Sequence, residues 1–173
     1  MATGTFFERY RLLTKATRLL RGAATVDAVL EVLRRQARRI AEADGVSVIR
    51  RVGERVHYVG EDAIAPLWAG QAFPIERCVS GMAILARAPI VIPDIEADGR
   101  VPLGLYLSTF VRSMAVYPLG GPAPCAALGL YWREPRTLGR DVDALMTMLA
   151  SGANAAFERV AIEGEIGLGA VAA

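Results

Sequence analysis

The sequence is short of the residue types on which most catalytic and metal sites depend. Its 173 residues include a single histidine and two cysteines. His57 lies in a β-branched stretch with no nucleophile motif beside it, so it does not indicate a Ser-His-Asp or Cys-His centre. Cys78 and Cys125 have no second Cys or His at metal-ligand spacing. We therefore expect no enzymatic activity, no metal site, and two free thiols in a reducing compartment.

Membrane and nucleic-acid signals are also lacking. No apolar run approaches the roughly 20 residues that a membrane helix needs, and no basic region precedes an apolar run near the start. The net charge of +2 is close to neutral, which gives no strong field for a polyanion. The arginine clusters at 34–39 and 50–55 have no interleaved aromatics and no recognition-helix motif. We expect a cytoplasmic protein that binds neither membrane nor nucleic acid.

What the chain does contain is enough apolar sequence for one core. Hydrophobic residues make up 53% of it, and its length suits a single domain. Hydrophobic periodicity predicts long helices over 5–21, 25–43 and 140–160, shorter helical turns at 65–70, 78–87 and 103–110, and extended segments at 46–51, 55–59, 73–75, 89–95, 112–119 and 126–133. This order predicts an α+β fold with a central antiparallel sheet of five or six strands and terminal helices packed on one face. We divide the chain into an amphipathic helix (1–22), a domain (23–160) and a flexible tail (161–173).

The first helix carries a seam of apolar or tolerated residues at alternating spacings of three and four. The seam consists of Phe6, Tyr10, Leu13, Thr17 and Leu20. Such spacing is typical of helices that pair. Because one sheet face cannot cover the whole stripe, we expect a homodimer formed through the terminal helices.

Three motifs in the second half of the chain resemble the GAF family of sensory domains. A helix of small residues (80–88) precedes Pro-Ile-Val-Ile-Pro-Asp at 89–94. The sequence Arg-Ser-x-x-x-x-Pro-Leu follows at 112–119, and Leu-Gly-Leu lies in the returning strand at 128–130. The resemblance covers residues 25–159. It implies a GAF-like sheet and a protein that binds and signals.

Specialised members of that family have signatures that this sequence does not match. Bilin-binding members that use a GAF cysteine place it beside a histidine before the Arg-Ser strand, and residues 106–110 contain neither. Free methionine sulfoxide reductases use a cysteine set that Cys78 and Cys125 do not reproduce. Cyclic-nucleotide-binding members carry an Asn-Lys-x-Asp signature, whereas Lys15 is the only lysine here. The comparison favours a generic sensor whose ligand is unknown.

The resemblance also implies a ligand cavity against the sheet. Its expected lining is apolar with a few polar groups: Phe73, Ile75, Met82, Ile92, Asp94, Tyr106, Thr109, Ser113, Ala115 and Tyr117. The alternatives are a filled core that takes no ligand and, for Asp94, a solvated loop in which Asp98 and Gly99 form a turn. If the cavity exists, Ala115→Phe is expected to fill it.

Two functions from different classes follow. The first is a sensory domain that binds a small molecule and signals through its terminal helices to a partner such as a histidine kinase. The second is a dimerisation or adaptor module of the same fold without a ligand. An enzyme similar to methionine sulfoxide reductase is a third, less favoured interpretation.

Overall fold

A six-stranded antiparallel sheet separates two layers of different composition. The computed structural model describes residues 5–171, with side chains through residue 164. In chain order the elements are α1 (Phe6–Gly22), α2 (Val26–Ala41), β1 (Gly45–Val52), β2 (Arg55–Ala63), β3 (Ala72–Pro74), the 3-10 turn η1 (Ile75–Arg77), α3 (Val79–Ala86), β4 (Ile90–Ile92), the 3-10 turn η2 (Leu103–Leu105), β5 (Ser113–Leu119), β6 (Ala126–Trp132) and α4 (Arg140–Val171). The strand order is β3-β2-β1-β6-β5-β4. The predicted fold class is confirmed.

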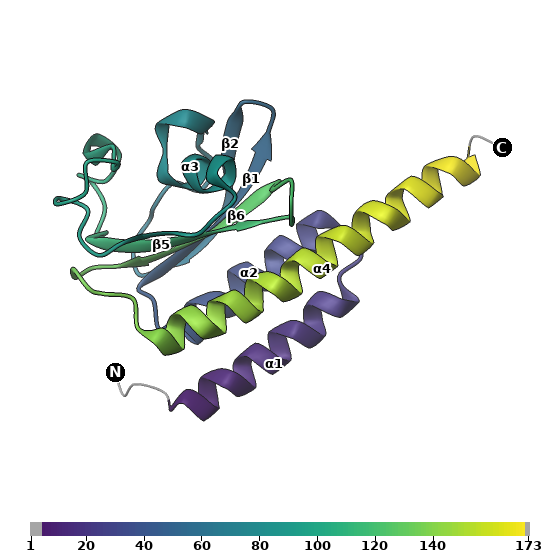
Figure 1. Ribbon diagram of the computed structural model, residues 1–173, viewed down its shortest axis with the longest axis horizontal. Coiled ribbons are helices and arrows are strands. Elements are labelled where there is room, and N and C mark those ends of the chain that lie inside the picture. The colour runs from purple at the N-terminus through teal and green to yellow at the C-terminus, as the bar shows by residue number, and fades with distance from the viewer. Residues whose placement is uncertain (1–4, 172–173) are drawn as a thin grey trace.

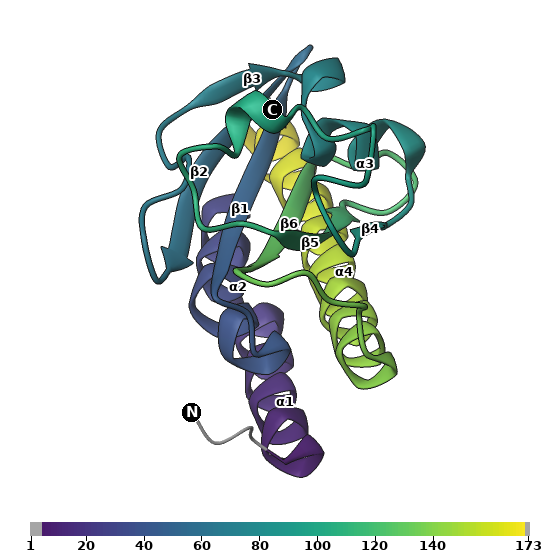
Figure 2. The same ribbon diagram turned by 90° about the vertical axis from the view of Figure 1, so that its left-hand side faces the viewer.

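The long helices all lie on one side of the sheet (Figures 1 and 2). Helices α2 and α4 contact the strands directly, whereas α1 contacts α2 and α4. The terminal helices are therefore on one face, as predicted, but α1 forms an outer layer of its own. On the opposite face lie α3 and the loops that join β4 to β5.

Two threonines start the first two helices. The side chain of Thr5 accepts a hydrogen bond from the backbone N–H of Glu8, whose carboxylate accepts one from the N–H of Thr5. Thr25, at the start of the second helix, accepts from the N–H of Ala28. These bonds satisfy N–H groups that have no partner inside a helix.

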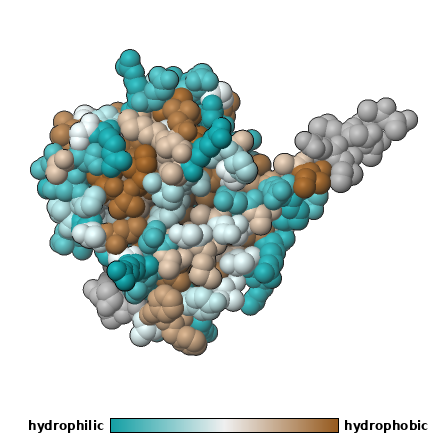
Figure 3. All heavy atoms as spheres, in the orientation of Figure 1, coloured by the Kyte–Doolittle hydropathy of each residue, from teal (hydrophilic) through white to brown (hydrophobic). Residues whose placement is uncertain are grey.

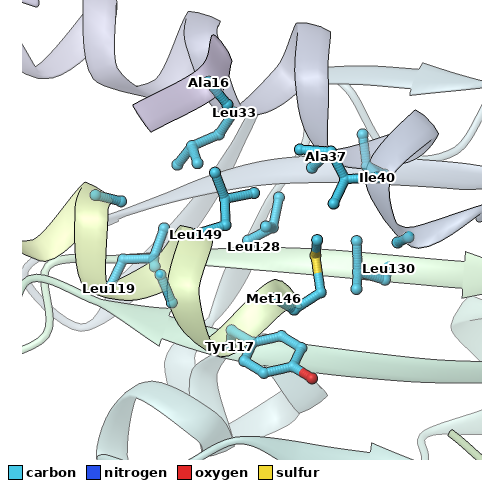
Figure 4. Close-up of a cluster of buried hydrophobic side chains, with 14 of the residues drawn as sticks. Ala16, Leu33, Ala37, Ile40, Tyr117, Leu119, Leu128, Leu130, Met146 and Leu149 are labelled. Carbon is cyan, nitrogen blue, oxygen red and sulfur yellow. The ribbon is translucent and has the colours of Figure 1, made fainter. Parts of the chain in front are cut away.

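The core between the helices and the sheet is assembled from alternate residues of the strands. Leu128 and Leu130 of β6 meet Leu33 and Ile40 of α2 and Leu149 of α4 (Figure 4). All five side chains are fully buried. At about 25 cal/mol per Å² of apolar area removed from water, this layer supplies most of what holds the long helices to the sheet.

The seam of α1 is used inside the molecule, which corrects the expectation that it stays uncovered. Leu13 and Leu20 are buried in the core shared with α2 and α4. Phe6 and Tyr10, nearer the start of the helix, remain 52% and 42% exposed and stack on each other with ring centroids 6.3 Å apart. Of the aromatic and aliphatic residues of the seam, only these two, in the first turns of α1, stay exposed.

Two segments differ from the prediction. Residues 65–70 form a loop and not a helical turn, and the Glu61 carboxylate accepts the backbone N–H groups of Leu67, Trp68 and Ala69 there. Helix α4 continues to Val171, through most of the segment expected to be a flexible tail (161–173). Glycines at 164, 167 and 169 lower helix propensity there, but no proline interrupts the helix.

Arg87 offers a way to strengthen the end of α3. It caps the helix with a positive φ of 56°, and its side chain is exposed. A residue with a Cβ is strained in that left-handed conformation, whereas glycine is not. We expect Arg87→Gly to raise the free energy of unfolding by about 0.5–1 kcal/mol in urea titrations. Arg87→Ala keeps the strained Cβ and should give no gain, and equal stabilisation by both variants would contradict this account.

Candidate functional site

The sheet face opposite the long helices holds the candidate site. Against this face pack α3, η1 and the chain that joins β4 to β5. Apolar side chains are exposed over this half of the molecule (Figure 3), and the structure gives Leu107 an exposed fraction of 83%. An apolar surface beside a layered core is where ligand sites commonly form.

A groove of about 640 Å³ opens between the η1–α3 segment and residues 99–105. Phe73 and Met82 form one wall, and Val101, Leu103 and Leu105 form the other. The lining is therefore mostly apolar. Its charged side chains are Glu76, Arg77 and Arg100. A groove of this size lies within the range that small-molecule sites occupy.

One of the groove's cations is held in place by its neighbour. The guanidinium of Arg100 donates to the Asp98 carboxylate at 2.6 Å and 3.0 Å. This contact lowers the pKa of Asp98 to about 2. Arg77 makes no ion pair with any of the described residues. Of the two arginines in the groove, Arg77 is thus the one without an ion-pair partner among the described residues.

Behind the groove lies a packed aromatic cluster. Trp68 is at its centre, with its ring centroid 5.5 Å from Tyr58, 5.0 Å from Tyr106 and 5.3 Å from Tyr131. Phe73 completes it, 5.5 Å from Tyr58. All four pairs meet edge to face, an arrangement that aromatic rings prefer. Side chains therefore fill the interior of this half of the molecule.

The cluster contains polar atoms that pair with one another. The Tyr58 hydroxyl lies 3.0 Å from Ser80 Oγ, which lies 3.4 Å from Cys78 Sγ. The Tyr106 hydroxyl donates to the sulfur of Met114 at 3.7 Å. Burial raises the pKa of Tyr58 and that of Tyr106 well above the ordinary value. Both phenols are therefore neutral at every physiological pH and serve as hydrogen-bonding groups.

The groove and the cluster share Phe73 and are joined by one hydrogen bond. Phe73 lines the groove and packs on Tyr58. The indole Nε1 of Trp68 donates to the carbonyl oxygen of Leu105, in the other wall, at 3.1 Å. A displacement of either wall therefore acts directly on the aromatic rings.

Comparison with solved structures shows that this architecture is an established one. The chain aligns with the GAF domain of a phosphoenolpyruvate-protein phosphotransferase from Coxiella burnetii at a TM-score of 0.76 and 14% identity, over 94% of this chain and 99% of that one. A free methionine-R-sulfoxide reductase from Neisseria meningitidis, in complex with its substrate, aligns at 0.75 and 16% identity, over 94% and 96%. The phycocyanobilin-bound GAF domain of a cyanobacterial phytochrome aligns at 0.73 and 16% identity, over 90% and 96%. The chain has the GAF fold.

This assignment rests on structure, since no family model and no curated protein matches the sequence. The resemblance seen in the sequence motifs is thereby confirmed for the fold. The GAF-fold proteins named above include a phosphotransferase domain, an enzyme and a chromophore-bound domain. The fold alone thus does not select one activity.

Within this GAF fold, three of the predicted site residues lie on the side of the sheet opposite the groove. Ser113, Ala115 and Tyr117 are buried on the face of β5 that meets the long helices. The Tyr117 hydroxyl donates to the Asp143 carboxylate of α4 at 2.9 Å, and Ser113 Oγ donates to the carbonyl of Glu134 at 2.8 Å. Alternation along a strand puts these three side chains together, but it does not say which face takes the ligand. Ala115→Phe would therefore overpack the helix layer and not fill the groove.

The other predicted residues lie on the groove side, at different depths. Phe73 and Met82 line the groove. Ile75, Ile92 and Tyr106 are buried in the core that includes the aromatic cluster. Thr109 is half-buried and donates to the carbonyl of Tyr106, and Asp94 accepts the backbone N–H of Glu96 at 3.0 Å as part of a turn. The remaining groove residues lie mainly in 99–105, where the sequence indicates a turn at Asp98 and Gly99 and helical turns from 103 but no ligand site.

The thiols and carboxylates of this GAF fold are dispersed. Cys78 is buried in the core that includes the aromatic cluster, whereas Cys125 is exposed on the β5–β6 hairpin, and both are free. In the part of the chain that the structure describes, no group of three or more His, Cys, Asp or Glu side chains is placed to hold a metal ion. The described helices likewise include none with the length and hydrophobicity to cross a bilayer.

Proposed function

We propose that this GAF-fold chain is a cytoplasmic sensory domain that binds a small molecule in the groove between the η1–α3 segment and residues 99–105. The observation that carries the proposal is that both walls of an open, mostly apolar groove are joined to one buried aromatic cluster. A ligand that presses on either wall must move rings that already fill their space. Close packing makes such a region respond as a unit.

The groove favours a ligand that is mostly apolar and carries at most one negative group. Phe73, Met82, Leu103 and Leu105 offer apolar contacts. Arg77 supplies one cation, since Arg100 is already engaged by Asp98. Cys78 and Cys125 do not line the groove, and neither has a catalytic role in this function.

The signal would leave through β5. Met114 and Val116 of this strand belong to the aromatic side, whereas Ala115 and Tyr117 belong to the helix side. The Tyr117–Asp143 hydrogen bond then links β5 to α4. The partner that reads α4 is proposed to be a signalling protein such as a histidine kinase.

A thermal-shift screen of metabolites tests the proposal. A true ligand should stabilise the fold by about 2.7 kcal/mol at a hundredfold excess over its dissociation constant. Met82→Trp should block the groove and abolish that shift. Met148→Trp is the matched control, because Met148 is 48% exposed on α4 and does not line the groove. A screen without hits, or a hit that both variants lose equally, would argue against the sensor.

The ligandless adaptor remains the second candidate, and the exposed aromatics of α1 are the surface through which it would pair. Phe6, Phe7 and Tyr10 are 52%, 69% and 42% exposed. Such side chains are common at protein interfaces. The adaptor and the sensor both allow the proposed homodimer through the terminal helices, so only the ligand screen separates them.

A further inference from the structure

A second groove, far larger than the first, runs along the outer helices. It is lined by α1, by the end of α2 and the residues that follow it, and by Asp62 of β2, and its volume is about 1240 Å³. Helices α1 and α2 lie side by side in both views (Figures 1 and 2). The sheet and the long-helix core separate this groove from the one proposed for the sensory ligand.

The charges of this groove are unbalanced. Six cationic side chains and four carboxylates line it. Each carboxylate already has a partner: Glu8 accepts from Thr5, Glu42 lies 3.9 Å from Arg9, Asp44 accepts from Arg133, and Asp62 accepts from Arg38. Among residues 5–164, in contrast, no ion-pair partner is found for four of the six cations: Arg11, Lys15, Arg18 and Arg39.

The Arg9 side chain contains a nitrogen, Nη2, that is buried without a hydrogen-bond partner among the described residues. The side chain is only 8% exposed, its Nε donates to the carbonyl oxygen of Ile40 at 2.8 Å, and its Nη1 is the nitrogen nearest Glu42. A buried donor without an acceptor costs free energy that a bound oxygen would recover.

The end of α2 does not compete for that donor. The Ile40 carbonyl is taken by Arg9 Nε, and the Ala43 carbonyl accepts from Arg38 at 3.3 Å. The indole of Trp132 donates to the carbonyl of Glu42 at 3.0 Å. With these helix-end carbonyls satisfied, the free cationic groups are available to an incoming anion.

We infer that this groove binds a phosphate-bearing small molecule. A phosphate monoester carries between one and a half and two negative charges at neutral pH, about what the surplus of cations requires. Its several oxygens suit guanidinium donors, which pair with phosphate in a bidentate manner. Lys15 and Arg39 would hold its oxygens at the rim, and the buried guanidinium of Arg9, which also lines the groove, would add its charge.

Calorimetric titration of the full chain with inorganic phosphate tests this inference, with sodium chloride at matched ionic strength as the blank. The key variant is Lys15→Gln combined with Arg39→Gln. Both side chains are exposed, so the fold should be kept. The matched control is Arg21→Gln combined with Arg35→Gln, which removes the same net charge from the same two helices outside the groove. We expect at least tenfold weaker phosphate binding in the first pair and less than a twofold change in the second.

Three results would overturn the inference. The first is the absence of saturable heat when phosphate is titrated into the parent chain. The second is equal weakening of phosphate binding in both double variants, which would indicate diffuse charge. The third is binding to phosphatidylcholine vesicles that contain phosphatidate without any response to soluble phosphate. Ligand binding in the sensory groove is measured with Met82→Trp. Failure of one site therefore does not imply failure of the other.

Discussion

Replacement of Gly81 by alanine is expected to lower the free energy of unfolding by more than about 3 kcal/mol, a large fraction of the roughly 5–15 kcal/mol that stabilises an ordinary domain. A Cβ at this position would lie 1.7 Å from the carbonyl oxygen of Ile75. That contact is with backbone, so no side-chain rotation relieves it. Ile75 is itself fixed, because its side chain is buried and its N–H donates to Glu54 at 2.9 Å.

Urea unfolding followed by circular dichroism measures this effect. Gly104→Ala is the control, since a Cβ at Gly104 meets nothing within 4 Å. It should change stability by less than about 0.5 kcal/mol. A Gly81→Ala protein that unfolds at the same urea concentration as the control would show that α3 does not dock on η1 as described.

Replacement of Trp68 by alanine has the second largest expected effect. The side chain is 4% exposed and touches three tyrosine rings. Large-to-small changes of buried tryptophan typically cost about 3–5 kcal/mol. The same change removes the hydrogen bond to Leu105, so the 99–105 wall of the groove should also loosen.

Trp68→Phe separates the two consequences. It keeps an aromatic ring in the cluster but cannot donate to Leu105. We expect Trp68→Phe to lose less stability than Trp68→Ala. The missing hydrogen bond should cost about 0.5–1.5 kcal/mol, in addition to the cost of the altered packing. Amide hydrogen exchange should become faster only in residues 103–106. Exchange rates in that segment that match the parent chain would mean that the indole does not hold the wall.

The sequence predicts the elements of this fold better than their limits. Threonine caps at Thr5 and Thr25 are local signals, and the structure keeps both helix starts. The loop at 65–70 is hydrogen-bonded to the carboxylate of Glu61, which lies outside that segment and leaves no periodic trace within it. The length of α4 was underestimated because glycine lowers helix propensity by only about 1 kcal/mol and does not end a helix by itself.

The candidate site was harder to predict than the fold. Alternation correctly places Ser113, Ala115 and Tyr117 on one face of a strand, but both faces of β5 are buried, so polarity does not tell them apart. The sequence did not indicate Trp68, because its role depends on contacts with the rings of three tyrosines that are distant in the sequence: Tyr58, Tyr106 and Tyr131. Contacts between distant segments are what a single sequence conceals.

The hydrogen bonds between α4 and the sheet determine which movements the helix can make. Asp143 accepts from Tyr117, and Asn154, eleven residues later, accepts from the N–H of Gly120 at 2.8 Å. At 1.5 Å per residue these anchors stand about 16 Å apart. A rod fastened at two points along its length cannot slide like a piston unless both fastenings break together. Any message carried by α4 must therefore be a bend or a twist of the part beyond Asn154.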